Sequence, residues 1–332
     1  MQRCICKVVV VVNLVLCTAC LFVVHERIAV AENTAVIDVI RKDVLAYIRS
    51  IHSLEYEIDD DDGSGKNGTR HLKYWQQGNM FRGESFSTKW EPWISTYNGV
   101  RYQIFFKERE MMSLKNTSTI PSPTRVIGPP VIAFAWLAKS GMTFTWSDLT
   151  SEKNVNEHFL KAKYIGEEYL DSNVCTVLEF AGVIEGSVTK VWFSKGKSNF
   201  PIKTLLSMGN HNTAETTITS FESVQTDDGV SVLTPTGVAG MNNFNQSKPA
   251  VIRKTSVVQG TLKVNKKYDE DFFTLPTTLA KTVNDIDKLE KEGLLTPTSS
   301  IEVRQHSYFW LVVVNGVVIA MLLCRLLLRK RK

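Results

Sequence analysis

The sequence predicts a mainly β protein of the α+β class. We expect a curved antiparallel sheet with an N-terminal helix, an inserted apolar helix and a C-terminal transmembrane helix. Apolar and polar residues alternate in short runs between residues 54 and 265, and Gly, Asn and Asp separate the runs. The sequence has neither a βαβ alternation nor a convincing repeat. An apolar run with a basic tail predicts the membrane anchor.

This apolar run covers residues 308–328 and is interrupted only by Asn315, Gly316 and Arg325. About 20 apolar residues in a helix cross a hydrocarbon core of about 30 Å. Residues 329–332 are all Lys or Arg, so the positive-inside rule predicts a cytoplasmic tail.

Residues 1–31 have the pattern of a signal peptide. A basic start precedes the apolar stretch 8–24, and Ala29-Val30-Ala31 fits a cleavage site. The apolar stretch also suits an uncleaved anchor, and Thr18-Ala19-Cys20 resembles part of a lipidation signal. Cleaved signal and uncleaved anchor both export the middle of the chain. We therefore expect a single-pass cell-membrane protein whose main domain is periplasmic or at the cell surface.

The net charge of +5 belongs to the two ends of the chain. The leader contributes +2 and residues 305–332 contribute +5, so the body at 32–304 carries −2. A body without a basic surface does not favour nucleic acid as a partner. Five of the six cysteines lie in the leader or the anchor, which leaves Cys175 alone. We expect no disulfide within the body and no metal site.

The first elements are an amphipathic helix and a β meander. Residues 33–52 predict the helix, because isoleucine and valine recur three and four positions apart. Strands follow at 54–58 and around Leu72 and Tyr74. Further strands are predicted at 80–86, 93–97 and 100–106, and Asn98-Gly99 is a strong hairpin signal between the last two.

Residues 131–140 predict a short apolar helix, with Pro130 in its first turn and Gly141 at its end. The concave face of the sheet would cover it. Prolines at 121, 123, 129 and 130 separate this helix from the flanking strands, so we expect it to act as a lid. Trp136→Ala should then lower the free energy of unfolding by less than about 2 kcal/mol and alter the binding of a hydrophobic probe.

Within the body, the exported β half-barrel domain is expected to extend over residues 32–275, followed by a spacer at 276–307 that leads to the membrane. The remaining strands are predicted at 161–168, 173–180, 188–194, 201–208, 215–224, 230–234 and 252–265.

Motifs for chemistry are incomplete. Asp60-x-Asp62-x-Ser64-Gly65 opens like a calcium loop, but His71 stands where the bidentate Glu belongs, so a solvated hairpin turn is the preferred interpretation. Gly196-Lys197-Ser198 resembles the end of a phosphate-binding loop, but Val191 stands where that motif requires its upstream glycine. We therefore expect a protein that is not an enzyme and needs no cofactor.

Aromatic residues concentrate between residues 75 and 146. An aromatic core explains them, and so does an apolar cleft between the sheet and the 131–140 helix, which would suit a lipid tail. The residues predicted to line such a cleft are Trp75, Phe81, Trp93, Phe105, Ile132, Phe134, Trp136 and Leu137.

The order of these parts resembles the LolA/LolB/RseB superfamily of periplasmic lipoprotein-carrier-like proteins. The phrases that carry the resemblance are residues 36–56, 97–102, 166–175, 191–193, 199–203 and 271–276. It implies an open antiparallel β half-barrel whose apolar concave face, lidded by helices, binds acyl chains or a protein partner. A C-terminal anchor departs from a freely shuttling carrier.

We therefore expect a non-enzymatic, membrane-tethered envelope protein that binds a lipid, an acyl chain or a lipidated protein. The alternative is an envelope interaction or sensor module with a packed interior and no lipid ligand. Asn67, Asn116 and Asn245 are acceptors only if the host glycosylates asparagine.

Overall fold

The computed structural model describes residues 32–61, 63, 69–86, 91–117, 128–138, 149, 151–182, 186–209, 212–243 and 251–294. The predicted leader, transmembrane helix and basic tail lie outside these ranges, as do Asn67 and Asn245. Within the described ranges, no helix has both the length and the apolar character needed to span a membrane.

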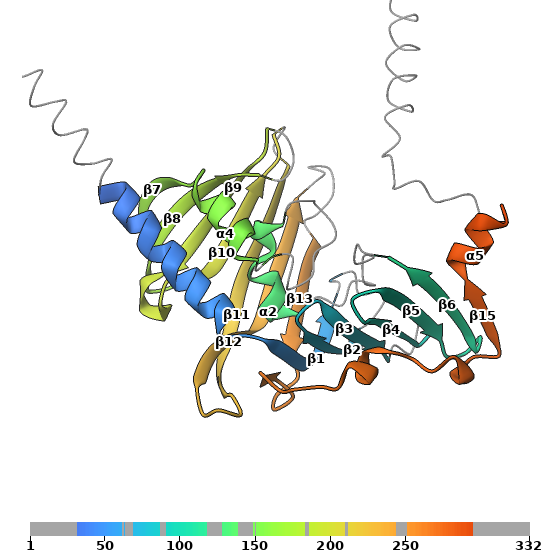
Figure 1. The fold of residues 1–332 in the computed structure, drawn as a ribbon. Helices are drawn as coiled ribbons and strands as arrows, with labels where there is room; N and C mark the ends of the chain where they lie inside the picture. The colour runs from blue at the N-terminus through green and yellow to red at the C-terminus, as the bar shows by residue number, and fades with distance from the viewer. Residues whose placement is uncertain are drawn as a thin grey trace, which may run out of the picture. The chain divides into compact units, whose positions relative to one another are not determined.

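The described strands form one open, curved, mainly antiparallel sheet (Figure 1), in the order β15-β6-β5-β4-β3-β2-β1-β13-β12-β11-β10-β9-β8-β7. Strand β14 pairs with β1 beside this path. The strands are β1 (Ser53–Asp61), β2 (Thr69–Gln77), β3 (Met80–Ser85), β4 (Trp93–Tyr97), β5 (Arg101–Phe106), β6 (Met111–Asn116), β7 (Lys163–Leu170), β8 (Asn173–Ala181), β9 (Val188–Ser194), β10 (Phe200–Ser207), β11 (Thr213–Gln225), β12 (Ser231–Asn243), β13 (Val251–Val257), β14 (Lys263–Val264) and β15 (Thr282–Asp285).

Two meanders make up this sheet. One runs outward from β1 to β6, and the other runs from β7 to β13. They join where β1 pairs with β13, with Ile58 opposite Val257. A mainly β fold with a large curved sheet is therefore confirmed, and it fits a half-barrel.

The helices are an N-terminal helix at residues 32–49, α2 (Pro129–Ile132), α4 (Glu152–Phe159) and α5 (Ile286–Lys291). Short 3-10 turns are η1 (Ala135–Leu137), η2 (Lys195–Lys197), η3 (Glu270–Phe273) and η4 (Thr277–Leu279). The described residues 284–294 belong to a second compact unit. In it, the Asp285 side chain caps α5 by accepting a hydrogen bond from the Lys288 N–H at 3.1 Å.

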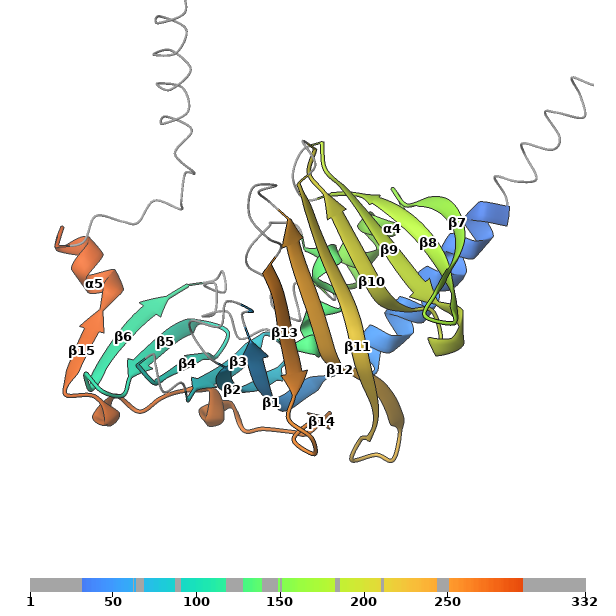
Figure 2. The ribbon, with the colours of Figure 1, turned by 180° about the vertical axis from the view of Figure 1, so that it is seen from behind.

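The N-terminal helix, α2 and α4 lie against one face of the second meander, here called the inner face (Figures 1 and 2). On β1, Leu54, Tyr56 and Ile58 are buried on this face, as their alternation predicts. Ile40 and Val44 of the helix join the same apolar cluster, which confirms the predicted helical spacing.

The opposite, outer face of the first meander is covered by residues 265–281, here called the strap. Gln103 donates from Nε2 to the Leu275 carbonyl at 2.9 Å, and the Leu275 N–H donates to Oε1 of Gln103 at 2.8 Å. Gln77 and Tyr268 exchange the same two kinds of hydrogen bond, at 3.1 and 2.8 Å. The strap therefore seals a smaller apolar cluster of Ile94, Phe105, Met112, Leu114 and Leu275.

The predicted single helix at 131–140 is wrong. The chain forms α2 and then η1, and it breaks at Phe134, where φ is −109° and ψ is 9°. This break lets Phe134, Trp136 and Leu137 all pack into the inner-face cluster, which one short helix could not do with neighbouring positions.

Two further differences concern the connections. Helix α4 was not predicted, although Ser151 caps it by accepting a hydrogen bond from the Asn154 N–H at 3.2 Å. The predicted spacer at 276–307 begins with regular structure, namely η4, β15 and α5.

Candidate functional site

A groove of about 340 Å³ opens between the N-terminal helix and the ends of β10 and β12. We call it the helix–hairpin groove. It is lined by Asp43, Val44, Ala46, Tyr47, Ser50, Phe134, Lys197, Ser198, Asn199, Phe200, Pro201, Val230, Ser231, Val232 and Leu233. Its volume lies at the lower end of the range of about 300–1,000 Å³ for small-molecule sites.

Aromatic rings build the wall of this groove. The ring of Tyr47 stacks on Phe134 with 5.3 Å between centroids, and its edge meets Phe200 at 4.9 Å. Phe134 and Phe200 are themselves in edge contact at 5.4 Å. Burial raises the pKa of Tyr47 well above its ordinary value, with partial compensation by the Thr234 side chain, so its ring stays neutral. The wall is therefore apolar and uncharged.

A tight turn forms the opposite rim. Ser198 and Asn199 both adopt left-handed backbone conformations, with φ of 51° and 53°. Asn199 donates from Nδ2 to the Asp43 carboxylate at 2.7 Å, which ties the turn to the N-terminal helix. This tie holds the mouth of the groove in place.

The groove has two charged residues in its lining, Asp43 and Lys197. The Lys197 Nζ lies 3.9 Å from the centroid of the Phe221 ring, a cation–π contact. Among the described ion pairs, Lys197 has no carboxylate partner, whereas neighbouring Lys195 pairs with Glu167. The rim therefore combines one acidic and one basic group beside apolar walls.

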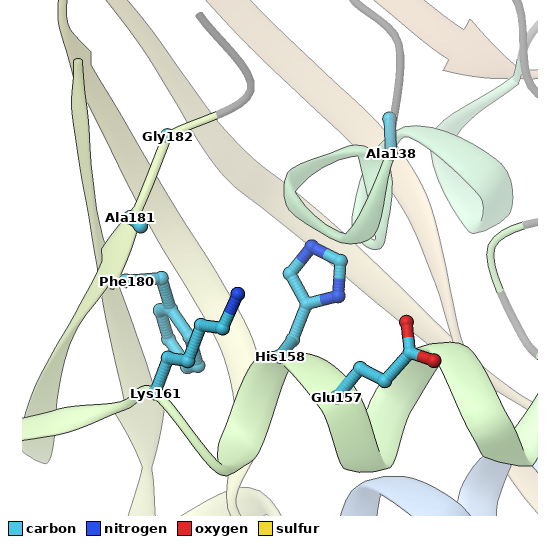
Figure 3. Close-up of a pocket in the computed structure, with 7 residues that line it drawn as sticks. All are labelled: Ala138, Glu157, His158, Lys161, Phe180, Ala181 and Gly182. Carbon is cyan, nitrogen blue, oxygen red and sulfur yellow. The ribbon is translucent and has the colours of Figure 1, made fainter. Parts of the chain in front are cut away.

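A second hollow of about 240 Å³ lies beside α4 and is lined by Ala138, Glu157, His158, Lys161, Phe180, Ala181 and Gly182. Figure 3 shows the side chains of Glu157, His158 and Lys161 projecting into it from α4 and the turn that follows. The His158 Nδ1 lies 2.9 Å from the Asn154 carbonyl. In the neutral ring Nδ1 therefore carries the proton, and Nε2 is left as an acceptor.

None of the described residues that line this second hollow is a serine, threonine or cysteine. A base without a hydroxyl or thiol beside it does not make a nucleophilic site. Across the described ranges, no group of His, Cys, Asp and Glu side chains is placed to hold a metal ion.

The structure brings together five of the eight residues predicted for the cleft. Phe81, Phe134, Trp136 and Leu137 lie in the inner-face cluster, and Trp93 packs against it. Ile132 is half-buried outside that cluster. One of these residues, Phe134, lines the helix–hairpin groove.

Two predicted cleft residues lie on the outer face instead. Trp75 packs edge-on against Phe272 of the strap at 5.5 Å. Phe105 belongs to the cluster that Leu275 of the strap covers. Successive residues of a strand point to opposite faces of the sheet. Tyr74 on β2 and Tyr102 on β5 face the inner cluster, so Trp75, one position later, and Phe105, three positions later, face the other way.

The predicted lid is a packed part of the core. Trp136 is 6 % exposed, and its ring contacts Phe159, Phe180 and Phe193 at 5.9, 4.8 and 5.7 Å. The expectation of a loosely packed lid is therefore wrong, because α4 and strands β8 and β9 close over this side chain.

Most of the residues that line the groove were not predicted from the sequence. One signal was available. Ala46 and Tyr47 lie three and four positions after Asp43, and Ser50 lies four and three positions after them, so the four residues form a stripe beside the apolar one. The turn at 195–199 comes from far away in the sequence, and nothing local indicates that it meets this stripe.

The prediction that Asp60 lies in a solvated turn is also wrong. Asp60 is 1 % exposed and accepts hydrogen bonds from Arg253 Nε at 2.7 Å, Arg253 Nη2 at 2.8 Å and Thr255 Oγ1 at 3.0 Å. Arg70 also pairs with this carboxylate. A carboxylate with these partners is a structural anion and not a calcium ligand.

Comparisons with known proteins give structural neighbours only. No family model and no curated protein matches this chain. A DUF1329 family protein from Desulfovibrio piger is 12 % identical, with a TM-score of 0.46 over 73 % of this chain and 96 % of that one.

Two further solved structures are similar. An outer membrane lipoprotein-sorting protein domain from Vibrio parahaemolyticus is 13 % identical, with a TM-score of 0.45 over 71 % of this chain and 94 % of its own. A LolA superfamily protein from Nitrosomonas europaea is 12 % identical, with a TM-score of 0.43 over 70 % and 97 %.

Proposed function

We propose that the chain is a non-enzymatic, membrane-tethered protein of the cell envelope that binds an acyl chain in the helix–hairpin groove. The observation that carries this proposal is the groove itself, which has a neutral aromatic wall and a polar rim. An acyl chain needs an apolar channel, and the head group attached to it needs a polar mouth.

The energetics are sufficient for a weak to moderate ligand. Each buried methylene contributes about 0.8 kcal/mol. A segment of about eight methylenes would contribute about 6 kcal/mol before the cost of immobilisation is subtracted. We therefore expect reversible capture of one chain and not permanent storage.

The tether is part of the proposal and rests on the apolar run 308–328 and the basic residues 329–332. A reporter fused after Lys332 should be active in the cytoplasm, and a reporter inserted before residue 300 should be active outside it. An exported C-terminal reporter would contradict the proposed orientation.

The groove is tested with the full-length protein in lipid nanodiscs and a photoreactive fatty acid, whose attachment sites are mapped by mass spectrometry. We expect labelling of peptides from residues 32–50 and 195–207. Ala46→Trp should reduce this labelling, because Ala46 is exposed and lines the groove, so a larger side chain fills it without removing core packing.

Ala35→Trp is the matched control. Ala35 is exposed on the same helix, eleven residues before Ala46, which places it about 16 Å away along the helix axis. If the groove peptides are labelled equally strongly in Ala46→Trp and Ala35→Trp, the acyl chain does not enter the groove.

A protein-interaction or sensor module is the second candidate function, and the packed interior favours it. Phe134 and Leu137 are fully buried, and Trp136 is nearly so. Crosslinking in intact cells should then capture one specific protein neighbour, and the photoreactive fatty acid should label no groove peptide.

A further inference from the structure

We propose that the helix–hairpin groove selects a phospholipid with a phosphoethanolamine head, whose phosphate contacts Lys197 and whose ammonium contacts Asp43. This inference rests on the proposed function, since it names the class of lipid that the acyl-binding groove takes. It is carried by the charges in the lining of the groove.

Those charges are one cation and one anion. Asp43 lies on the N-terminal helix and Lys197 lies on the facing turn. Every other described lining residue is apolar or a neutral polar residue such as Ser50, Ser198 or Ser231. A simple anionic lipid would satisfy Lys197 but would place its charge near the Asp43 carboxylate, and a fatty acid would do the same.

The two residues that carry these charges also lie near one another in the fold. Asn199, which donates to the Asp43 carboxylate at 2.7 Å, is only two residues from Lys197. Two residues span at most about 7 Å, so the backbone of Lys197 lies near the clasp that fixes Asp43. The phosphate and ammonium of phosphoethanolamine are joined by a short ethylene link, which suits neighbouring rather than distant partners.

The kind of cation follows from the chemistry of Asp43. A carboxylate forms its strongest contacts with donors that carry N–H groups. The primary ammonium of ethanolamine has three such donors, whereas the quaternary ammonium of choline has none. Lys197 can bind phosphate as a point charge. Its ammonium lies 3.9 Å from the centroid of the Phe221 ring and has no carboxylate partner among the described ion pairs.

The experiment uses the full-length protein in nanodiscs doped with one of three phospholipids that carry the same photoreactive acyl chain. Their heads are phosphoethanolamine, phosphocholine or phosphoglycerol. We expect the labelling of groove peptides to be about three- to tenfold stronger with phosphoethanolamine, the range for a partly exposed charged contact.

Two variants assign the head-group contacts. Asp43→Asn should remove the preference over phosphocholine and raise labelling by the phosphoglycerol lipid, while the amide oxygen of this variant can still accept the hydrogen bond from Asn199. Lys197→Gln should lower labelling by all three phospholipids. The matched controls are Asp38→Asn, whose native side chain pairs with Arg41 on the same helix, and Lys195→Gln, whose native side chain pairs with Glu167. Neither should change the preference.

The outcomes separate the two proposals. Equal labelling by the three heads, or a preference that Asp43→Asn leaves intact, would overturn the head-group assignment while acyl binding stands. Failure of both the fatty acid and the phospholipids to label the groove would overturn the proposed function itself. Thermal unfolding by circular dichroism checks that each variant folds.

Discussion

Asp60 shows how one residue position can be predicted in part. It continues the inward-facing series of Leu54, Tyr56 and Ile58 on β1, so its alternation indicates an inner position. Its partner Arg253 lies on β13, across the join of the two meanders. The face of Asp60 could be predicted from the sequence, whereas the ion pair that makes burial tolerable could not, because it depends on a distant strand.

Burial raises the pKa of Asp60, but Arg253, Arg70 and Thr255 outweigh that effect, and the pKa is lowered overall. As the pH falls, the Asp60 carboxylate is therefore protonated at a higher pH in the unfolded chain than in the folded protein. The stabilisation is present above the ordinary carboxyl range near pH 4 and is lost as the pH falls through the lowered value. We expect Asp60→Asn to flatten the pH dependence of the unfolding free energy below about pH 4, measured by urea titration. An unchanged slope would contradict this.

The same carboxylate should matter at neutral pH. Asp60→Ala leaves two arginines without their anion, and loss of one partner of a buried pair costs about 3–5 kcal/mol. Because Arg70 and Arg253 are partly exposed, we expect the lower part of that range. Urea titration at pH 7 measures it. Asp59→Ala, at an exposed neighbouring position, should cost much less.

Trp136 gives a second test at this scale. Because it is packed against three phenylalanines, Trp136→Ala should lower the free energy of unfolding by about 3–5 kcal/mol. Trp75→Ala, at a half-buried position on the outer face, should cost less. Equal, small losses in a denaturant titration would restore the interpretation of a loose lid.

At the scale of elements, alternation and turn residues predicted most strands. The Asn98-Gly99 hairpin between β4 and β5 is confirmed, and β9 has the predicted bounds. The prediction of one helix at 131–140 was wrong because every residue of an apolar run can be buried. The run therefore does not show which side chains must point inward together. The groove was not predicted for a related reason. The sequence around Tyr47 and the sequence around Lys197 contain no local signal of a binding site, and only the fold brings these two segments together.

The strap is an element held by side-chain amides. Gln103 is 2 % exposed, so Gln103→Ala would leave the Leu275 N–H and carbonyl unpaired in a buried setting, at a cost of about 2–4 kcal/mol. Hydrogen exchange should show lost protection at Leu275 but not at Tyr268. Gln77→Ala should give the reverse pattern, and a uniform change along the strap would argue against separate clamps.

At the scale of the whole molecule, the sheet depends on apolar packing and not on crosslinks. Cys175 is fully buried with Val177, Trp192 and Ile202, and it is the free cysteine among the described residues. Burial could be predicted from the sequence, because Cys175 lies in the strand-like run Val174-Cys175-Thr176-Val177-Leu178.

We expect a reducing agent to leave the melting temperature of the full-length protein unchanged. Burial raises the pKa of the Cys175 thiol, which keeps it protonated and unreactive at neutral pH. A thiol reagent should therefore modify Cys175 only after denaturant is added, as peptide mapping would show. Rapid modification of the native protein, or a fall in melting temperature on reduction, would contradict this.

The join of the two meanders also sets the order in which the chain can fold during synthesis. As the chain emerges N-terminus first, β1 to β6 are complete long before Val251–Val257 arrives, and one edge of β1 stays open in the meantime. An open edge is a template for wrong pairing, and pairings between distant segments form slowly. A nascent chain arrested before residue 251 should therefore bind chaperones, and extension past residue 264 should release it.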